Sequence, residues 1–238
     1  MKKKADKNKE MSIFEHLEEL RERVLISLIA FSLISAGCLI YIKNISYILK
    51  QPACGIRFLQ LAPGEYFFTS IKIAIYSGFL FSSPFIVYQI ILFILPGLTK
   101  KERSLLIPAL SFSILLFFAG ILFAYKILAP AALNFLVNYG AEIVEPIWSF
   151  EQYFNFILLL LFSTGAIFQV PIAQVVLGIF NIFSSQQMIS YWRYVIFIST
   201  IIAAILTPST DPMTQIIMSL TILFLYISGI VALRTLNK

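Results

Sequence analysis

Charged residues are scarce in this chain of 238 residues: Asp, Glu, Lys and Arg make up 13%, and hydrophobic residues 59%. A soluble globular protein usually carries about 25% charged residues. With a mean hydropathy of +0.89, the chain has too little polar surface for a water-soluble fold. We therefore expect an all-α polytopic membrane protein with one membrane domain.

Histidine and cysteine are also rare, which argues against an enzyme, a metal centre and a disulfide framework. His16 is the single histidine, and no metal-ligating cluster surrounds it in the sequence. Cys38 is expected in a membrane span and Cys54 in a loop, so no disulfide framework is predicted. No catalytic residue and no cofactor are expected.

The net charge of +6 does not indicate a nucleic-acid partner, because the basic residues lie at the ends of hydrophobic segments. Residues 1–11 form a short polar tail without the Ser- and Arg-rich character of a transit peptide. Residues 12–238 are expected to form the membrane bundle with its loops. No convincing internal repeat is present, which weakens an inverted-repeat transporter interpretation.

Six hydrophobic segments are expected to span the membrane, at residues 24–42, 67–95, 105–128, 150–178, 191–206 and 213–233. The fifth gives roughly 24 Å of helix, against a hydrocarbon core of about 30 Å. Pro84 and Pro171 fall inside spans, and a kink is predicted at Pro84.

Two long segments between the predicted spans, residues 43–66 and 129–149, are expected to be outer loops. The apolar part of the first, residues 58–61, is too short to cross the membrane and is predicted to pack as a cap on its surface. Most of the 18 Lys and Arg residues fall on the side that would hold both termini. Since cytoplasmic loops are enriched in Lys and Arg, both termini are predicted to lie inside.

An acidic amphipathic segment runs directly into the first span. Ser12 and Glu15 have the spacing of a capping box, which predicts a helix start at Ser12. Glu15, Glu18, Glu19 and Glu22 recur at i, i+3, i+4 and i+7 and share one helix face. The alternative is a solvated helix end with Glu–Arg pairs within the helix.

Glu102, between the second and third predicted spans, is expected on the same side of the membrane as Glu19. Carboxylates beside a membrane suit the capture of a cationic peptide, because a guanidinium pairs with a carboxylate through two parallel hydrogen bonds. Two separated carboxylates could read two arginines. Exposed ion pairs are usually weak, so charge alone does not make this site specific.

A set of short segments occurs in order along nearly the whole chain. It comprises residues 16–21 (HLEELR), 83–89 (SPFIVYQ), 93–98 (FILPGL) with Glu102 and Arg103, 120–125 (GILFAY), 168–171 (FQVP), and 206–208 (LTP) with Asp211. Each segment alone is a weak signal, and together they are specific. The set resembles TatC, the core subunit of the twin-arginine protein translocase.

This resemblance implies six helices in a cup-shaped bundle and a receptor for signal peptides with paired arginines. It implies transport of folded proteins driven by the proton-motive force, together with single-span TatA-type and TatB-type subunits in a membrane oligomer. On this chain, Glu19 and Glu102 would contact the arginines. Arg21, Phe93 and Arg103 would be supporting positions.

The resemblance also assigns residues away from this acidic end. Pro52 in the first outer loop and Asp211 in the last match positions that are important in the family. Bacterial members typically have Glu where this chain has Gln169, and Gln resembles the plastid type. With a composition rich in Ile, Phe, Lys, Asn and Tyr, this favours a plastid thylakoid membrane, with a cyanobacterial or other bacterial membrane as the alternative.

Gln169 is expected to be a polar contact inside the membrane, because an unpaired amide in lipid is costly. Its partner is predicted to be a TatA-type or TatB-type helix. The alternative is a hydrogen bond within the bundle.

Two other functions fit a polytopic membrane protein. A secondary transporter of a small molecule or ion usually carries Asp, Glu or His within its spans. Away from the end turns of the predicted spans, however, Lys72 is the one charged residue, and it lies near an end where it can snorkel. The second rival is a structural assembly factor. Binding of a twin-arginine peptide, compared with a twin-lysine control, separates the three functions.

Overall fold

The structure is a computed structural model that describes residues 13–53, 55–139, 147–206 and 212–236. Among these residues, five helical segments are long and apolar enough to cross a membrane: Phe14–Ile40, Glu65–Gly97, Glu102–Asn138, Phe150–Ile179 and Pro212–Leu236. A shorter apolar helix, α9 (Trp192–Leu206), has 15 residues. The predicted all-α membrane fold is confirmed, and α9 spans only about 22 Å, as the sequence indicated.

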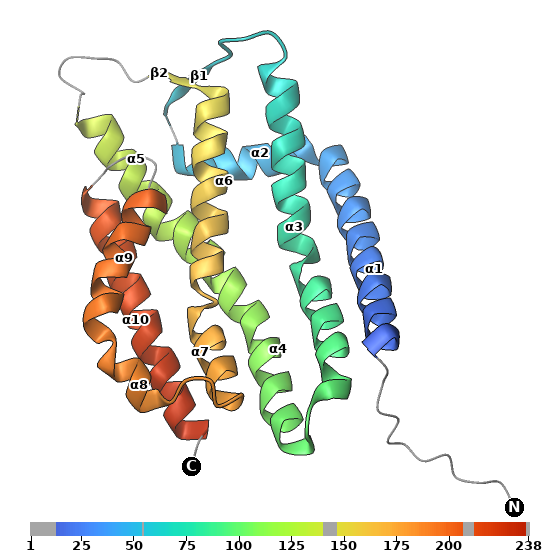
Figure 1. The fold of residues 1–238 in the computed structure, drawn as a ribbon. Coiled ribbons are helices and arrows are strands. Elements are labelled where there is room, and N and C mark those ends of the chain that lie inside the picture. The colour runs from blue at the N-terminus through green and yellow to red at the C-terminus, as the bar shows by residue number, and fades with distance from the viewer. Residues whose placement is uncertain (1–12, 54, 140–146, 207–211, 237–238) are drawn as a thin grey trace, which may run out of the picture.

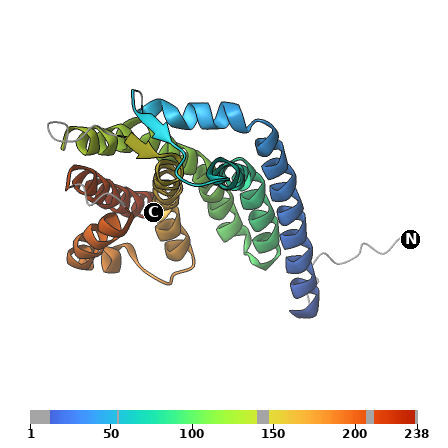
Figure 2. The same cartoon turned by 90° about the horizontal axis from the view of Figure 1, so that it is seen from above.

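The helices form an open arrangement with α1 at one edge and α9 and α10 at the other (Figures 1 and 2). Helix α1 (Ile13–Ile40) packs mainly on α3 (Glu65–Ile94), which in turn contacts α6 (Phe150–Ile167). Helix α10 (Pro212–Leu236) packs on α7 (Val170–Ile179) and on α9. The start of α1 and the end of α10 lie at the same end of the bundle (Figure 1).

The core is centred on α6, whose side chains Phe154, Ile157 and Leu160 are almost completely buried. Helix α1 is the opposite case. Its apolar side chains are largely exposed, including Leu33 and Ile40, as expected for a helix that faces lipid on most sides. The position of α1 therefore depends on its contact with α3.

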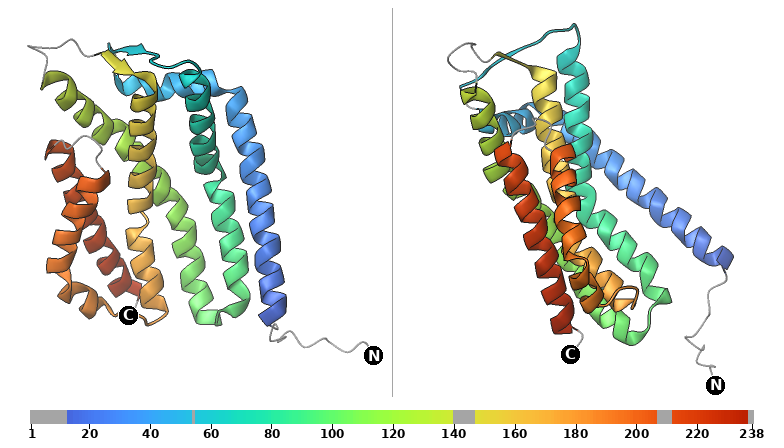
Figure 3. Two further views of the ribbon diagram at one scale, coloured as in Figure 1. Left: turned by 45° about the horizontal axis from the view of Figure 1, so that its top comes forward. Right: turned by 60° about the vertical axis from the view of Figure 1, so that its left-hand side comes forward.

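Pro84 lies inside α3 and removes the backbone donor that would otherwise reach the carbonyl of Leu80. The hydroxyl of Ser83 donates to that carbonyl at 2.7 Å, so the acceptor is still satisfied. Figure 3 shows α3 changing direction near its middle, in agreement with the predicted kink.

Residues 129–149 were predicted to be a loop, which is wrong for their first half. The third span consists of α4 (Lys100–Phe123), a π-helical segment η3 (Ala124–Leu128) and α5 (Ala129–Asn138). The predicted loop included Pro130. This proline falls in the first turn after η3, where the hydrogen-bond register already changes, so its missing donor is tolerated.

Residues 43–66 also contain more structure than a loop and a surface cap. Helix α2 (Ile42–Lys50) leads into a short 3-10 turn, η1 (Gln51–Ala53). Strand β1 (Arg57–Leu59) then pairs in parallel with β2 (Ile147–Ser149). The apolar residues near Phe58 therefore pack in a two-stranded sheet that joins the two outer segments.

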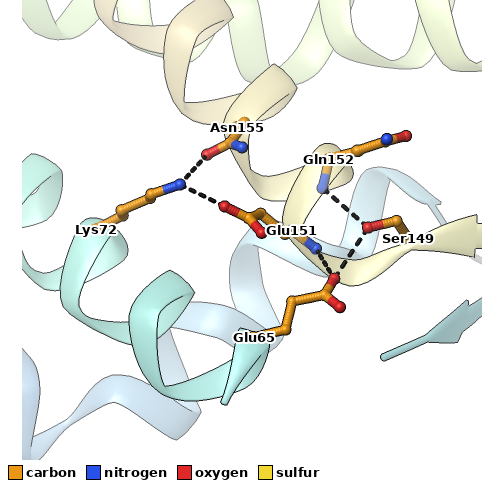
Figure 4. A network of polar contacts seen from close by, with 6 residues as sticks. All are labelled: Glu65, Lys72, Ser149, Glu151, Gln152 and Asn155. Atoms are coloured by element: carbon orange, nitrogen blue, oxygen red, sulfur yellow. Dashed lines mark hydrogen bonds and ion pairs between the residues drawn. The ribbon is translucent and has the colours of Figure 1, made fainter. Parts of the chain in front are cut away.

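A carboxylate clasp holds this outer end together. Glu65, at the start of α3, is 4% exposed. Its Oε2 accepts hydrogen bonds from the backbone nitrogens of Leu61 and Ala62, at 2.6 and 3.1 Å. Its Oε1 accepts from Ser149 Oγ at 2.9 Å and from the backbone nitrogen of Glu151 at 2.8 Å (Figure 4). The clasp thereby fixes the start of α6 against the start of α3.

Lys72 was expected to snorkel toward the membrane surface, but the structure gives it partners. Its ammonium group lies 2.6 Å from Glu151 Oε1 and 3.2 Å from Asn155 Oδ1 (Figure 4). Glu151 belongs to the first turn of α6, so the charge of Lys72 is balanced between two neighbouring helices.

Two segments with sequence predictions, residues 1–12 and 207–211, lie outside the described residues. The predicted capping box depends on Ser12, which is not described, and α1 is described from Ile13. Helix α8 (Ser185–Ser190) begins with a capping box of Ser184 and Gln187 and lies between the fourth and fifth predicted spans.

Candidate functional site

Glu19 lies on the side of α1 that faces α3. Its side chain is 17% exposed, whereas that of the neighbouring Glu18 is 74% exposed. Arg23, one turn further along α1, donates to Glu19 Oε1 through Nε at 2.9 Å and through a second guanidinium nitrogen. Residues four apart share a helix face, so α1 itself supplies an arginine to this carboxylate.

The second oxygen of Glu19, Oε2, is buried and accepts no hydrogen bond from the described residues. His16 Nδ1 is 3.9 Å away, which is too far for a hydrogen bond. The His16 ring stacks on Phe93 of α3, with ring centroids 4.3 Å apart and an interplanar angle of 13°. A buried acceptor without a donor is unfavourable, so the Glu19 carboxylate is only half satisfied by the described residues.

Glu19, His16, Arg23, Phe93 and Gln89 together form the Glu19 cluster. An apolar groove of about 400 Å³ extends from this cluster between α1 and α3. Arg23, Gln89 and Phe93 line the end nearest Glu19, and Phe31 and Phe79 line the other end. Among the described residues that line the groove, Arg23 has the one charged side chain. Its third guanidinium nitrogen donates to Gln89 Oε1 at 3.4 Å, so Arg23 bridges the two helices.

Glu102 lies in the first turn of α4, and its carboxylate takes part in a capping box. Its Oε2 accepts from the backbone nitrogen of Thr99 at 2.9 Å and from Thr99 Oγ1 at 2.7 Å. The turn between α3 and α4 lies at the same end of the bundle as the start of α1 (Figure 1). No hydrogen bond or ion pair links Glu102 to Glu19, both of which are described, so they are separate acceptors.

The three predicted supporting residues, Phe93, Arg21 and Arg103, differ in whether they contact the Glu19 cluster. Phe93 contacts the Glu19 cluster through His16. Arg21 is 74% exposed, and its guanidinium lies 3.8 Å from Glu18, so it is outside the cluster. Arg103 is exposed in the first turn of α4.

Sequence reasoning missed two members of this cluster, His16 and Gln89. The Glu19–Arg23 pair is one of the Glu–Arg pairs within the helix that the sequence left as an alternative. The i, i+4 spacing of Glu19 and Arg23 was an available signal. Gln89 could not have been assigned, because its contact depends on how α1 and α3 are aligned along their axes.

Gln169 lies at the break between α6 and α7, and its Nε2 donates to the backbone carbonyl of Ser113 on α4 at 3.1 Å. This is the bond within the bundle that the sequence left as an alternative. The preceding Phe168 packs on Gly120, where an added Cβ would lie 2.7 Å from the phenyl ring. The segments 120–125 and 168–171, which are far apart in the sequence, therefore pack against each other at Gly120 and Phe168.

Pro52, the first of the two outer-loop candidates, follows α2 and lies beyond the end of α1 opposite to Glu19. Pro52 is half-buried in η1, beside the buried Ala53. Asp211 lies outside the described residues. The structure therefore places Pro52 in the outer cap, which consists of α2, η1 and the sheet of β1 and β2. The functional role of Asp211 stays a prediction.

The family of the chain follows from comparison with known proteins. A family model described as "Sec-independent protein translocase protein (TatC)" matches residues 15–220. The chain belongs to the TatC family. The TatC-like protein of Gracilaria tenuistipitata var. liui is 69% identical over 100% of both chains. TatC of a Synechocystis species is 54% identical over 96% of this chain and 90% of that protein.

The other matches agree with this family. A chloroplastic TatC protein of Oryza sativa subsp. japonica is 53% identical over 93% of this chain and 62% of that protein. A crystal structure described as the twin arginine translocase receptor TatC is 36% identical, with a TM-score of 0.81 over 94% of this chain and 100% of that one.

The TatC family confirms the predicted fold and role. The chain is a multi-pass membrane protein and a core subunit of the twin-arginine translocase. It is a component of a transport system and not an enzyme. The chloroplast and cyanobacterial relatives support a thylakoid or bacterial membrane as its location.

Proposed function

We propose that this chain binds signal peptides with paired arginines through Glu19 and Glu102. The observation that supports this most strongly is the state of Glu19. Its carboxylate is largely buried, one oxygen already holds a guanidinium, and the other has no donor among the described residues. A carboxylate that already holds the guanidinium of Arg23 has the charge and geometry to hold a peptide arginine in its place.

Glu102 is the second carboxylate of the proposed site. It is partly exposed at the same end of the bundle, and no hydrogen bond or ion pair joins it to Glu19. Two separate acceptors suit two arginines better than one, because each guanidinium can then make its own charge-assisted hydrogen bonds. Signal peptides also carry an apolar segment, and the apolar groove beside Glu19 suits part of it.

The remaining parts of the proposal concern the complex in the membrane. The chain transports folded proteins with energy from the proton-motive force, together with TatA-type and TatB-type single-span subunits in an oligomer. Gln169 contacts one of those subunits. Its Nε2 is bonded to Ser113, and its carbonyl oxygen is the atom proposed to meet the partner helix.

In this proposal, the end of the bundle that carries Glu19 and Glu102 faces the cytoplasm or its organelle equivalent. Single cysteines near residues 8 and 235, in a background without Cys38 and Cys54, resist an impermeant reagent applied from outside. A cysteine at Ala141 reacts. Opposite labelling of the two termini rejects this orientation.

Peptide binding tests the recognition step directly. A twin-arginine peptide and a twin-lysine peptide are titrated against the purified protein and its Glu19→Gln and Glu102→Gln variants. Because a hydrogen bond to a charged group contributes about 1.5–3 kcal/mol, Glu19→Gln weakens twin-arginine binding by about tenfold or more. Glu102→Gln weakens it in the same direction.

Glu18→Gln is the matched control, since it removes the same charge from an exposed neighbour on the same helix. It leaves binding within about twofold, as exposed ion pairs contribute little. The proposal is wrong if Glu19→Gln and Glu102→Gln together leave the affinity unchanged.

A further inference from the structure

Arg23 is hydrogen-bonded to the carboxylate of Glu19. The proposed function assigns that same carboxylate to an arginine of the signal peptide. Resting on that function, we infer that Arg23 is an intramolecular competitor of the peptide. It holds Glu19 in the empty receptor and moves to Gln89 when a peptide arginine arrives. Arg23 thereby sets the affinity threshold that a signal peptide must exceed.

The geometry around Glu19 leaves no open acceptor. Two nitrogens of Arg23 donate to Oε1, while Oε2 is buried near the stacked rings of His16 and Phe93. A guanidinium from outside therefore reaches Oε1 only after Arg23 has left it. Arg23 is itself 24% exposed, so its long side chain can rotate without a shift of the helix backbone.

Gln89 provides the place to which Arg23 moves. Its side chain is 8% exposed, and its Oε1 already accepts from Arg23 at 3.4 Å, a long contact that a small rotation would shorten. The groove around it is otherwise almost entirely apolar. Without the amide oxygen of Gln89, the hydroxyl of Ser27 would be the one side-chain acceptor left for a displaced guanidinium among the described residues of the lining.

The exchange keeps the number of ion pairs constant. A peptide guanidinium replaces Arg23 on Glu19, and the Arg23 guanidinium passes to a neutral acceptor. When the binding-competent state is only a fraction of the population, the apparent affinity falls by that fraction for every ligand. The competitor therefore lowers the affinity for all peptides by the same factor, without changing the ratio between them.

Substitution of Arg23 tests this competition. Arg23→Gln is expected to raise the affinity for the twin-arginine and the twin-lysine peptides by the same factor, about threefold to tenfold. Gln89→Leu is expected to lower both affinities, since it removes the acceptor for the displaced guanidinium. Arg23→Lys keeps the charge but loses the forked geometry, so its effect lies between those of the wild type and Arg23→Gln.

Two controls separate competition from a general charge effect. Arg234→Gln removes one positive charge from an exposed position in the last turn of α10, and it is expected to leave both affinities within about twofold. In a Glu19→Gln background, Arg23→Gln is expected to have no further effect, because there is no carboxylate left to compete for.

The inference is overturned if Arg23→Gln weakens twin-arginine binding or changes the ratio between the two peptides, since Arg23 would then position Glu19 or contact the peptide. It is also overturned if the gain persists in the Glu19→Gln background, which would indicate simple charge repulsion. Unchanged twin-arginine binding by Glu19→Gln and Glu102→Gln together, with Arg23 present, would instead overturn the proposed function.

Discussion

Gly78 of α3 sets the distance between α3 and α1, and its replacement by alanine is expected to disturb the peptide site from a distance. A Cβ added at Gly78 would lie 2.0 Å from Ser35 Oγ and 2.8 Å from Ser35 Cα. The hydroxyl can rotate away, but the backbone atom cannot. Since carbon atoms pack at about 3.5–4.0 Å, the two helices must separate by about 1 Å.

Two opposing effects give the size of the stability change. Overpacking a well-packed contact costs about 1–3 kcal/mol, whereas Gly→Ala in a helix gains about 0.5–1 kcal/mol. The net loss for Gly78→Ala is therefore about 1 kcal/mol, or about 2–4 °C in Tm for a chain of this size. The separation also strains the Arg23–Gln89 and His16–Phe93 contacts across the same helix pair, so twin-arginine peptide binding weakens as well.

Gly37→Ala is the matched control, because Gly37 lies in α1 and an added Cβ there meets nothing within 4 Å. It is expected to raise Tm slightly and to leave peptide binding unchanged. Thermal unfolding in detergent and peptide titration measure the two variants in parallel. If Gly78→Ala behaves like Gly37→Ala in both assays, the close packing of α1 on α3 does not support the site as argued.

Three further substitutions test other parts of the structure. Glu65→Gln replaces an acceptor oxygen of the outer clasp by an amide nitrogen that faces donors, so thermal unfolding shifts to lower temperature while twin-arginine peptide binding stays intact. Both side-chain polar atoms of Gln174 are buried without a partner among the described residues, so Gln174→Met is expected to stabilise the protein by about 1–2 kcal/mol in the same unfolding assay. Gln169→Leu breaks the bond to Ser113 at a cost of about 0.6 kcal/mol and is expected to reduce transport and crosslinking to TatA-type or TatB-type subunits, with peptide binding preserved. Gln169→Glu retains transport, and full transport by the Leu variant would leave Gln169 as a packing residue.

The membrane spans could be predicted well because hydrophobic length alone limits what can cross a bilayer. The outer segments could not. Helix α2 contains apolar residues at helical spacing, but it lies in the segment that was predicted to be the first outer loop, together with Pro52. Strand β1 was not predicted because it is three residues long and pairs with β2, which is far away in the sequence.

The site was predictable only in part for the same reason. Glu19 could be assigned from the acidic helix and the family resemblance, both of which are local in sequence. The roles of His16 and Gln89 depend on the contact of α1 with α3, and no spacing within either helix reveals that alignment. The pair of Arg23 with Glu19 follows from their i, i+4 relation, and it is one of the Glu–Arg pairs that the sequence left as an alternative.

The central claim is that a peptide arginine comes to lie beside Glu19, at the end of the bundle formed by the start of α1 and the end of α3. A twin-arginine peptide with a photoreactive residue next to its arginine pair tests this most directly. The account predicts crosslinks to α1 and α3 near His16 and Phe93, which Glu19→Gln abolishes and Glu18→Gln retains. Crosslinks confined to the outer cap around Pro52 or to α9 and α10, or crosslinks near His16 that persist undiminished in Glu19→Gln, would contradict it.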